Sequence, residues 1–560
     1  MVNQEIAEIF ENIANYLEMQ DSPNPFRIRA FKKAAEILNN YPQDISKYNI
    51  EQLKALPGIG ESLAQDILEY IKTGKMSYYE ELKKNSPVKL EELIKIQGIG
   101  PKTVKKLYYE LGVKTVEDLK KVAEEGKIAK LEGFGPRSEQ KILESLNFAI
   151  LNKQRTRLDI ALFTAEAYLK YLKDNLDFSH LEYAGSLRRK NETVGDIDIL
   201  GCYKDAVKAI EVFCSYPKVE KILGQGDTKA SVWLKEKIQV DFRVVPAESF
   251  GSALQYFTGS KDHNVHLRKI AVKKGLKLSE YGLFDKKTNK KIAGEKEKDI
   301  YVKLVNNYIE PELREDEGEI ELALQNKLPK LITLEDIKGD LQMHTTFSDG
   351  ANTIDEMVQA CIKKGYKFMG ITDHLGKLAV ANAVEEREFS EYLDALNEAK
   401  EKYRDKITLF ASGEVNIKPD GSLDFKESLL EKLDYVLASV HSSFQMDRET
   451  ATKRFLNAVE NPLVDIIGHP TARLIGKRKG LEFDAEKVFL SAVENNVAFE
   501  INAHPIRLDL PYNLARLAKD IGVKLSINTD AHSILDLDLM RFGVYTARKA
   551  GVEKENLYTL

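Results

Sequence analysis

The pattern of hydrophobic and polar positions divides this chain into three regions. In residues 1–150, amphipathic helical segments alternate with short turns that contain glycine. In residues 151–316, helical segments are mixed with β-branched runs such as VDFRVV (240–245), which predict neighbouring strands. In residues 338–560, β-branched runs such as YVLASVH (435–441) alternate with helical segments, which is typical of an α/β barrel. We therefore predict a multidomain protein of α+β and α/β architecture.

Composition agrees with several folded domains. The 560 residues are 43% hydrophobic and 31% charged, enough to bury more than one core. No apolar run approaches the roughly 18 residues of a membrane span, and Met1 leads into a polar amphipathic helix without a signal-peptide pattern. The three cysteines lack paired spacing, so we expect reduced thiols. These features predict a cytoplasmic protein with no membrane partner.

The charge is distributed unevenly along the chain. Residues 1–310 carry 51 Lys and Arg against 45 Asp and Glu, a net charge of +6, whereas the whole chain has −5 and residues 311–560 therefore −11. A positive N-terminal part favours contact with phosphates, and a negative C-terminal part favours bound cations. Ordinary surface bias explains an imbalance of this size equally well.

A glycine motif occurs three times in the N-terminal region, as LPGIG (56–60), IQGIG (96–100) and LEGFG (131–135). One such motif would usually end a helix. Three in series resemble helix-hairpin-helix units, whose turns point backbone N–H groups at a DNA phosphate without reading its sequence. The residues expected to contact DNA here are Gly58, Gly60, Gly98, Gly100, Lys102, Gly133 and Gly135.

The segment GSLRRKNETVGDIDIL (185–200) carries a candidate metal site. Asp196 and Asp198 share one face of a strand because side chains at i and i+2 point the same way, and Asp241 lies on the neighbouring predicted strand. Asp-x-Asp alone fits an ordinary solvated strand, but three carboxylates on adjacent strands suit Mg²⁺ and nucleotidyl transfer. The residues expected to meet a triphosphate are Gly185, Ser186, Arg189 and Gly195, through close backbone approach, a hydroxyl and a guanidinium.

This segment resembles the nucleotidyltransferase signature of family X DNA polymerases, the family of DNA polymerase beta, and YFTGSKDHNVHLR (256–268) is a second match. The resemblance implies that Tyr256 and Phe257 face the sugar of the incoming nucleotide and that Gly259 permits the turn. It also implies that Asn264 contacts the base and that Arg268 faces the template strand. Asp241 would then receive the proton of the primer 3′-hydroxyl.

The C-terminal region carries repeated metal-type ligands. Six of the nine histidines lie between 344 and 532, and several follow β-branched strands directly. The strand-end candidates are His374, Glu414, His441, His469, Asp530 and His532. Their mixture of imidazole and carboxylate ligands suits Mn²⁺ or Zn²⁺.

These motifs, which begin at GDLQMHTTFSDG (339–350), look like the polymerase and histidinol phosphatase (PHP) domain. The resemblance implies a distorted barrel that binds up to three metal ions and hydrolyses phosphoesters, and it adds His344 and Asp349 to the ligand set. His504 has no place in that set. The family pattern His-x-His is replaced here by Gln342-Met343-His344, so we expect one metal to be held more loosely.

A second departure concerns the first hairpin. In DNA polymerase beta a lysine on the following helix forms a Schiff base that removes a 5′-deoxyribose phosphate. Alignment on LPGIG places Asp66 at that position, and a carboxylate cannot form an imine. We therefore expect no lyase activity of this type, although Arg27 is placed to recognise a 5′-phosphate.

We expect six segments. They are a small helix-hairpin-helix domain (1–92), two further hairpins (93–150), a nucleotidyltransferase palm with a mixed sheet (151–250), a thumb (251–316), a linker (317–337) and a PHP-type barrel (338–560). The predicted function is monomeric gap-filling DNA repair synthesis with deoxynucleoside triphosphates. The barrel would supply a 3′-5′ exonuclease, with abasic-site endonuclease or 3′-phosphatase activity as further options. The alternatives are a small-molecule phosphatase tethered to DNA by an inactive polymerase half, and a non-enzymatic DNA-end scaffold.

Overall fold

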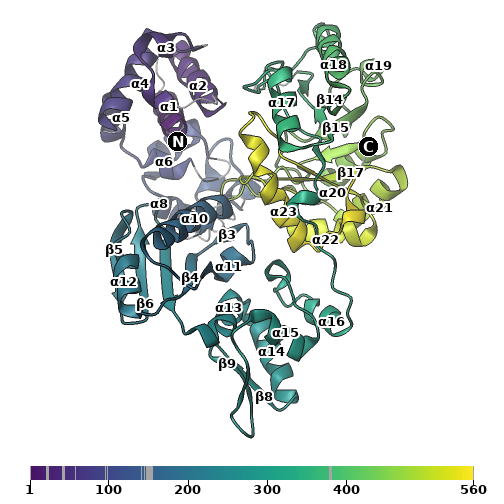
Figure 1. Ribbon diagram of the computed structural model, residues 1–560. Helices are drawn as coiled ribbons and strands as arrows, with labels where there is room; N and C mark the ends of the chain where they lie inside the picture. Colours follow the sequence, from purple (N-terminus) through teal and green to yellow (C-terminus); the bar gives the residue numbers. More distant parts are fainter. Residues whose placement is uncertain are drawn as a thin grey trace.

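The computed structural model describes residues 2–20, 24–40, 45–56, 58–94, 96, 99–140, 142–143, 146, 155–377 and 381–558. Figure 1 shows helical N-terminal domains, a palm with a sheet, an elongated thumb and a C-terminal barrel that lies beside the palm. This arrangement confirms the predicted fold class. None of the described helices is long and apolar enough to cross a membrane.

The N-terminal region is helical, as its amphipathic periodicity predicts. Its helices are α1 (Val2–Met19), α2 (Pro25–Asn40), α3 (Ile50–Lys54), α4 (Glu61–Thr73), α5 (Ser77–Asn85), α6 (Leu90–Leu93), α7 (Pro101–Leu111) and α8 (Val116–Glu124). Their apolar faces form one core that includes residues from Ile6 to Leu146. Gly60 is the N-cap of α4 and Gly100 is the N-cap of α7, so both glycines stand where a helix N-terminus begins.

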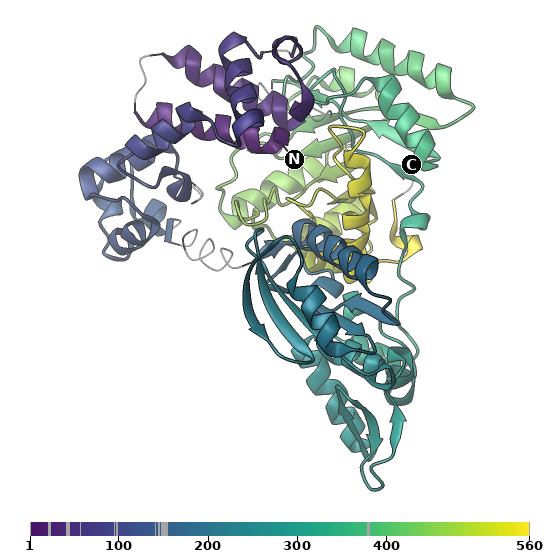
Figure 2. The ribbon, with the colours of Figure 1, turned by 60° about the vertical axis from the view of Figure 1, so that its left-hand side comes forward.

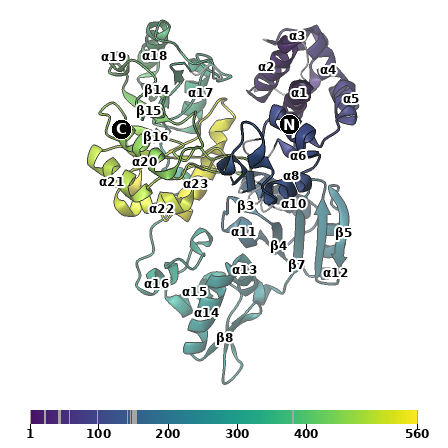
Figure 3. The same ribbon diagram turned by 180° about the vertical axis from the view of Figure 1, so that it is seen from behind.

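The palm contains a five-stranded mixed sheet of order β2-β4-β7-β6-β5, visible from behind in Figure 3. Only β4 and β7 run parallel, and the other pairs are antiparallel. The palm elements are β1 (Thr156–Arg157), α10 (Leu158–Asn175), β2 (His180–Tyr183), α11 (Gly185–Arg188), β3 (Thr193–Val194), β4 (Asp196–Cys202), α12 (Ala206–Cys214), β5 (Val219–Gln225), β6 (Lys229–Leu234) and β7 (Gln239–Val244). Ile197 and Ile199 of β4 are buried in the palm core, which leaves Asp196 and Asp198 on the opposite face.

The thumb combines helices with a three-stranded antiparallel sheet of order β10-β9-β8. Its elements are α13 (Phe250–Thr258), α14 (Lys261–Lys273), β8 (Leu276–Ser279), β9 (Gly282–Asp285), β10 (Lys291–Ala293), α15 (Glu297–Val305) and α16 (Glu319–Leu324). The fully buried Arg314 pairs with Glu297, and Arg188 of the palm donates to both oxygens of the same carboxylate. A buried charge pair of this kind fixes the junction of palm and thumb.

The C-terminal region is a parallel sheet of order β11-β12-β14-β15-β16-β17-β18, to which β13 adds beside β14. Its elements are β11 (Gly339–Asp340), α17 (Ile354–Lys364), β12 (Phe368–Ile371), β13 (His374–Leu375), α18 (Phe389–Tyr403), β14 (Thr408–Asn416), α19 (Glu427–Leu430), β15 (Tyr435–Ser439), α20 (Arg448–Val459), β16 (Ile466–Gly468), α21 (Ala485–Asn495), β17 (Ala498–Asn502), α22 (Tyr512–Ile521), β18 (Leu525–Asn528) and α23 (Met540–Lys549). A parallel bridge between Met343 and Ala531 brings the start of the sheet back to its end. The sheet is therefore a nearly closed barrel, whose strand carboxyl ends meet on one side.

The barrel packs directly on the palm, as Figure 2 shows for α10 and α23. Phe163 of α10 meets Phe542 of α23 edge to face, with ring centroids 6.3 Å apart. Arg541 pairs with Glu166 at 3.3 Å. Ile475, Leu508 and Phe542 of the barrel belong to the same apolar cluster as the palm core.

Candidate active sites

The three aspartates of the palm lie together on the parallel pair β4 and β7. Asp198 stands opposite Asp241 in the strand register, and Asp196 shares the face of Asp198. Burial, together with the nearby Asp196 and Asp241 carboxylates, raises the pKa of Asp198 to about 7. Burial and Asp241 also raise the pKa of Asp196. Carboxylates that are costly to ionise together fit a bound cation.

Asp241 is held by its own neighbours. Both of its carboxylate oxygens accept from the Gln239 amide, at 3.1 and 2.9 Å, and one also accepts from the Ser231 hydroxyl. Arg243 follows two residues later on the same face of β7, stacks 4.8 Å from the Phe257 ring centroid and lowers the pKa of Asp198. Arg243 is not among the residues predicted from the sequence, although its i+2 spacing from Asp241 is visible there.

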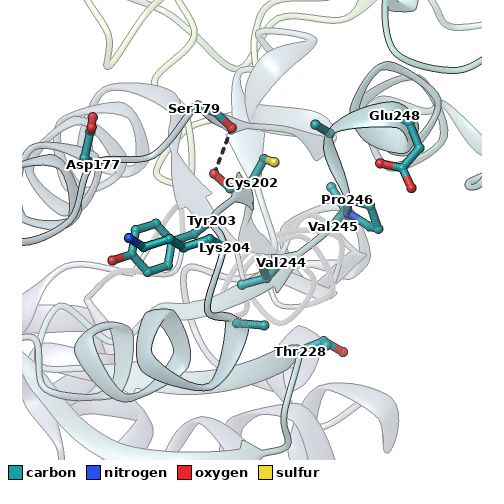
Figure 4. Close-up of a pocket in the computed structure, with 12 residues that line it drawn as sticks. Asp177, Ser179, Cys202, Tyr203, Lys204, Thr228, Val244, Val245, Pro246 and Glu248 are labelled. Carbon is teal, nitrogen blue, oxygen red and sulfur yellow. Dashed lines mark hydrogen bonds between the residues drawn. The ribbon is translucent and has the colours of Figure 1, made fainter.

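A cavity of about 450 Å³ opens at this face and is lined by Asp198, Asp241, Arg243 and Phe257 among others. A larger cavity of about 630 Å³ lies at the opposite end of β4 (Figure 4). There the Ser179 hydroxyl donates to the Cys202 carbonyl at 3.2 Å. None of the residues predicted to bind nucleotide lines this second cavity, whereas Asp198, Asp241 and Phe257 line the smaller one.

The glycine-serine turn before β4 touches the aspartates. Gly185 has a φ of +63°, and a side-chain carbon added there would collide with the Asp198 carboxylate. Ser186 lies within the short α11, and Arg189 follows the last residue of this helix. Arg189 donates to the Thr258 carbonyl at 2.5 Å and pairs with Glu315 at 3.0 Å, so part of its guanidinium is already engaged. Gly195 has open space around it, with only Arg155 within 4 Å.

The YFTGS block joins α13 to α14. Tyr256 and Phe257 are half-buried at the end of α13, Gly259 turns the chain with a φ of +71°, and Ser260 caps α14. The predicted base contact Asn264 is buried. Its side-chain amide accepts a hydrogen bond from Gln255 at 2.6 Å and donates one to the Tyr256 carbonyl at 2.7 Å. Arg268 lies half-buried on α14.

The eight predicted barrel ligands converge at the carboxyl ends of the strands. The described part of the chain contains three groups of candidate ligand atoms, and the atoms of each group lie within 4.8 Å of one another. They are His344, Asp349, His374 and His532; His374, Glu414 and His441; and His344, Glu414 and Asp530. His469 Nε2 lies 2.9 Å from Glu414 Oε1 and completes the set. No group among the described residues contains His504, and the aspartates of the palm form no such group.

The chemistry of these side chains fits metal ions. Several buried ligand atoms have no hydrogen-bond partner in the described part of the chain. They are Nδ1 of His344, His374, His441 and His469, and Oε2 of Glu414. Burial lowers the pKa of His374 to about 3, so this imidazole is neutral, the form that binds metal. Divalent cations are therefore implied at this site.

Gln342 pairs with a buried carboxylate of the barrel. It is fully buried, and with its amide in the orientation that satisfies both groups it donates to both carboxylate oxygens of Glu500. Glu500 also accepts from the backbone of His469 at 2.7 Å and from Asn528 at 2.8 Å and Asn502 at 3.1 Å. Glu500 is not among the residues predicted from the sequence, where its only signal is a carboxylate near the end of the apolar run VAFEIN (497–502).

Two arginines of the barrel loops, Arg473 and Arg507, are partly engaged within the protein. Arg473 donates to the carbonyls of Arg507 and Leu508 and pairs with Glu192 of the palm at 2.7 Å. Arg507 lies 3.5 Å from Asp530. Arg473 is therefore part of the palm–barrel interface, whereas Arg507 borders the ligand cluster.

In the first hairpin domain, Arg27 stacks 4.3 Å from the centroid of the Tyr78 ring, close to Asp66. Burial raises the pKa of Asp66 to about 6. Gly58 and Gly133 have positive φ angles, Lys102 is exposed, and Gly135 has open space around it. The predicted contact Gly98 lies outside the described residues.

Family models match four segments of the chain. A helix-hairpin-helix domain matches residues 1–76, a helix-hairpin-helix tandem matches 90–147, the DNA polymerase beta thumb matches 253–315 and the PHP domain matches 340–504. Together with the two sites, they define a polymerase of the beta type joined to a PHP barrel.

Similar proteins agree with this class. The chain is 40% identical, over its full length and 97% of the relative, to the DNA polymerase/3′-5′ exonuclease PolX of Bacillus subtilis (strain 168). It therefore belongs to the PolX family of family X DNA polymerases. A probable phosphatase of Thermoanaerobacter sp. (strain X514) is 33% identical over 39% of this chain and 87% of the relative. DNA polymerase lambda of Arabidopsis thaliana is 26% identical over 50% of this chain and 54% of the relative.

Proposed function

We propose that this chain is a template-directed, gap-filling DNA polymerase of repair, with a metal-dependent 3′-5′ exonuclease in its barrel. The observation that carries the proposal is that one chain brings together three aspartates on β4 and β7 and eight candidate ligands at the barrel strand ends. The substrates are gapped or primer–template DNA and deoxynucleoside triphosphates.

In the polymerase site, Asp196, Asp198 and Asp241 would hold Mg²⁺, which neutralises charge on the transferred phosphoryl group. Asp241 lies on the strand beside Asp198 and is the candidate to accept the primer 3′-hydroxyl proton. The turn at Gly185 brings backbone close to the phosphates, and Arg189 adds a positive charge. Tyr256 and Phe257 would exclude a ribose 2′-hydroxyl, which selects deoxynucleotides.

In the barrel, the ligand set would hold Mn²⁺ or Zn²⁺, up to three ions, which supply Lewis acidity toward a phosphodiester. His374, whose pKa burial lowers to about 3, offers a neutral nitrogen for an ion, and Glu414 takes part in two of the three groups. Arg507 borders this cluster and is placed to meet the scissile backbone. Similarity to a probable phosphatase supports phosphoester hydrolysis in the barrel. Activity as a 3′-phosphatase or cleavage at abasic sites is compatible with the same chemistry.

A primer extension assay on DNA with a one-nucleotide gap tests the proposal. We expect a 5′-labelled primer to lengthen by one nucleotide with deoxynucleotides and to shorten without them. Hydrolysis of p-nitrophenyl phosphate without any action on DNA would support a tethered phosphatase instead. DNA binding without turnover in Mg²⁺ and Mn²⁺ would support a scaffold.

A further inference from the structure

A lysine of the barrel reaches into the polymerase half. Lys549 is the last residue of α23, and only 4% of it is exposed. Its Nζ lies 2.5 Å from Glu315 Oε1 at the end of the thumb and 3.5 Å from the Arg189 carbonyl of the palm. A lysine rarely accepts such burial unless its charge is paired.

Glu315 connects Lys549 to Arg189 of the predicted nucleotide site. The oxygen that accepts Lys549 also accepts Arg189 Nε, at 3.0 Å. Arg189 Nη1 in turn donates to the Thr258 carbonyl and lies 3.0 Å from where a side-chain carbon on Gly259 would stand. Arg189 therefore links the glycine-serine turn, the thumb and the YFTGS block.

A second contact joins α23 to the same turn. Lys190 Nζ lies 4.5 Å from the ring centroid of Tyr545 on α23 and 4.8 Å from that of Tyr183 on β2. It also donates to the Tyr183 hydroxyl at 2.7 Å. The residues that follow the predicted phosphate-binding turn thus rest on a barrel helix.

We propose that Lys549 is a positioning residue of the polymerase site: through Glu315 it orients Arg189 toward the triphosphate, so that the barrel completes the nucleotide-binding corner. This inference rests on the proposed polymerase function. Arg189, Glu315 and Lys549 together carry a net charge of +1, and without Lys549 the remaining pair is neutral. Loss of Lys549 therefore removes both the orientation and the positive field that a triphosphate requires.

The test measures the Kd for a deoxynucleoside triphosphate on gapped DNA with a dideoxy-terminated primer, so that no turnover is needed. Lys549→Met is expected to weaken nucleotide binding about tenfold, the loss typical of one charge-assisted hydrogen bond, with the exonuclease rate unchanged. Lys549→Arg is expected to retain most of the affinity. Lys519→Met, which removes a barrel lysine that pairs with Asp520, is the matched control.

A charge-rescue variant separates the loss of positive charge from the loss of positioning through Glu315. Lys549→Met with Glu315→Gln restores the net charge of +1 and is expected to recover part of the affinity. The thermal midpoint of each variant shows whether it folds, and the double variant carries the test if Lys549→Met does not fold. If folded Lys549→Met binds the nucleotide within twofold of the wild-type affinity, the inference is overturned. The proposed function still stands in that case, provided that the wild type extends the primer. Absence of extension by the wild type would instead refute that function.

Discussion

Gln342 donates its side-chain amide to both carboxylate oxygens of Glu500, a residue that also contacts the segments of the predicted metal ligands. The same carboxylate holds the backbone of His469, and it holds Asn502, which donates to Asp530 at 3.1 Å. Glu500 therefore connects three segments of the barrel, each of which carries a predicted metal ligand. Partners of metal ligands commonly control affinity by fixing ligand orientation.

Replacement of Glu500 by glutamine should weaken metal retention. The amide cannot accept all four donors, so His469 and Asp530 lose a fixed position, and we expect roughly 10–100-fold lower metal affinity. Metal content after dialysis against graded chelator measures this loss. Glu494→Gln, on the exposed end of α21, is the matched control. Unchanged metal retention in a folded Glu500→Gln variant would refute the role of Glu500.

Replacement of Gln342 by alanine should lower stability without lowering the number of bound ions. The change leaves a buried carboxylate without two donors, which costs about 1–3 kcal/mol. His344→Ala, by contrast, removes an atom from two of the three ligand groups and should reduce the metal stoichiometry. Thermal unfolding and metal analysis of both variants distinguish the two effects, and loss of an ion from Gln342→Ala would show that Gln342 is a ligand.

Alanine at Gly185 should abolish primer extension. The added carbon would collide with the Asp198 carboxylate, and the φ of +63° disfavours any side chain there. We expect at least a 100-fold loss of extension with the exonuclease preserved, since displacing a reacting group by about 1 Å costs about that factor. Gly195→Ala meets only Arg155, at 3.9 Å, and should cause a much smaller loss. Equal losses in the two variants would exclude the steric explanation.

The carboxyl of Asp66 should make stability depend on pH. Burial raises its pKa from 3.8 to about 6, so the folded state favours the protonated form. This stabilisation is fully present below pH 3.8 and is lost as the pH rises through about 6. Asp66→Asn lacks the titration, so its thermal midpoint relative to wild type should rise from pH 4 to 6 and level off above 7. The change is small because the group is only half-buried. The exposed Glu8→Gln variant is the control, and a pH-independent difference would refute the shift.

Much of this architecture could be predicted because it is encoded locally. The three Gly-x-Gly motifs lie between amphipathic helices, and Asp196 and Asp198 share a face through a spacing of two residues. The barrel ligands follow apolar strands, and parallel strands place their carboxyl ends together. Local patterns of this kind need no knowledge of distant partners.

The remaining features depend on partners far apart in sequence. Gln342 looked like a weak ligand because Glu500 is 158 residues away, and the pairing that turns Gln342 inward exists only in the closed barrel. Arg189 looked free for phosphate, but Glu315 and Thr258 engage it from the thumb. Lys549 gave no sequence signal, since its role arises only where the barrel packs on the palm.

One measurement tests most directly whether the chain carries two separate active sites. Wild type, Asp198→Asn and His344→Ala are each given a 5′-labelled primer across a one-nucleotide gap in Mn²⁺, with and without deoxynucleotides; Asp227→Asn and His504→Ala are the matched controls. We expect Asp198→Asn to lose extension only, by more than 100-fold, and His344→Ala to lose shortening only. Extension by Asp198→Asn at the wild-type rate, or loss of both activities in either folded variant, would contradict the account.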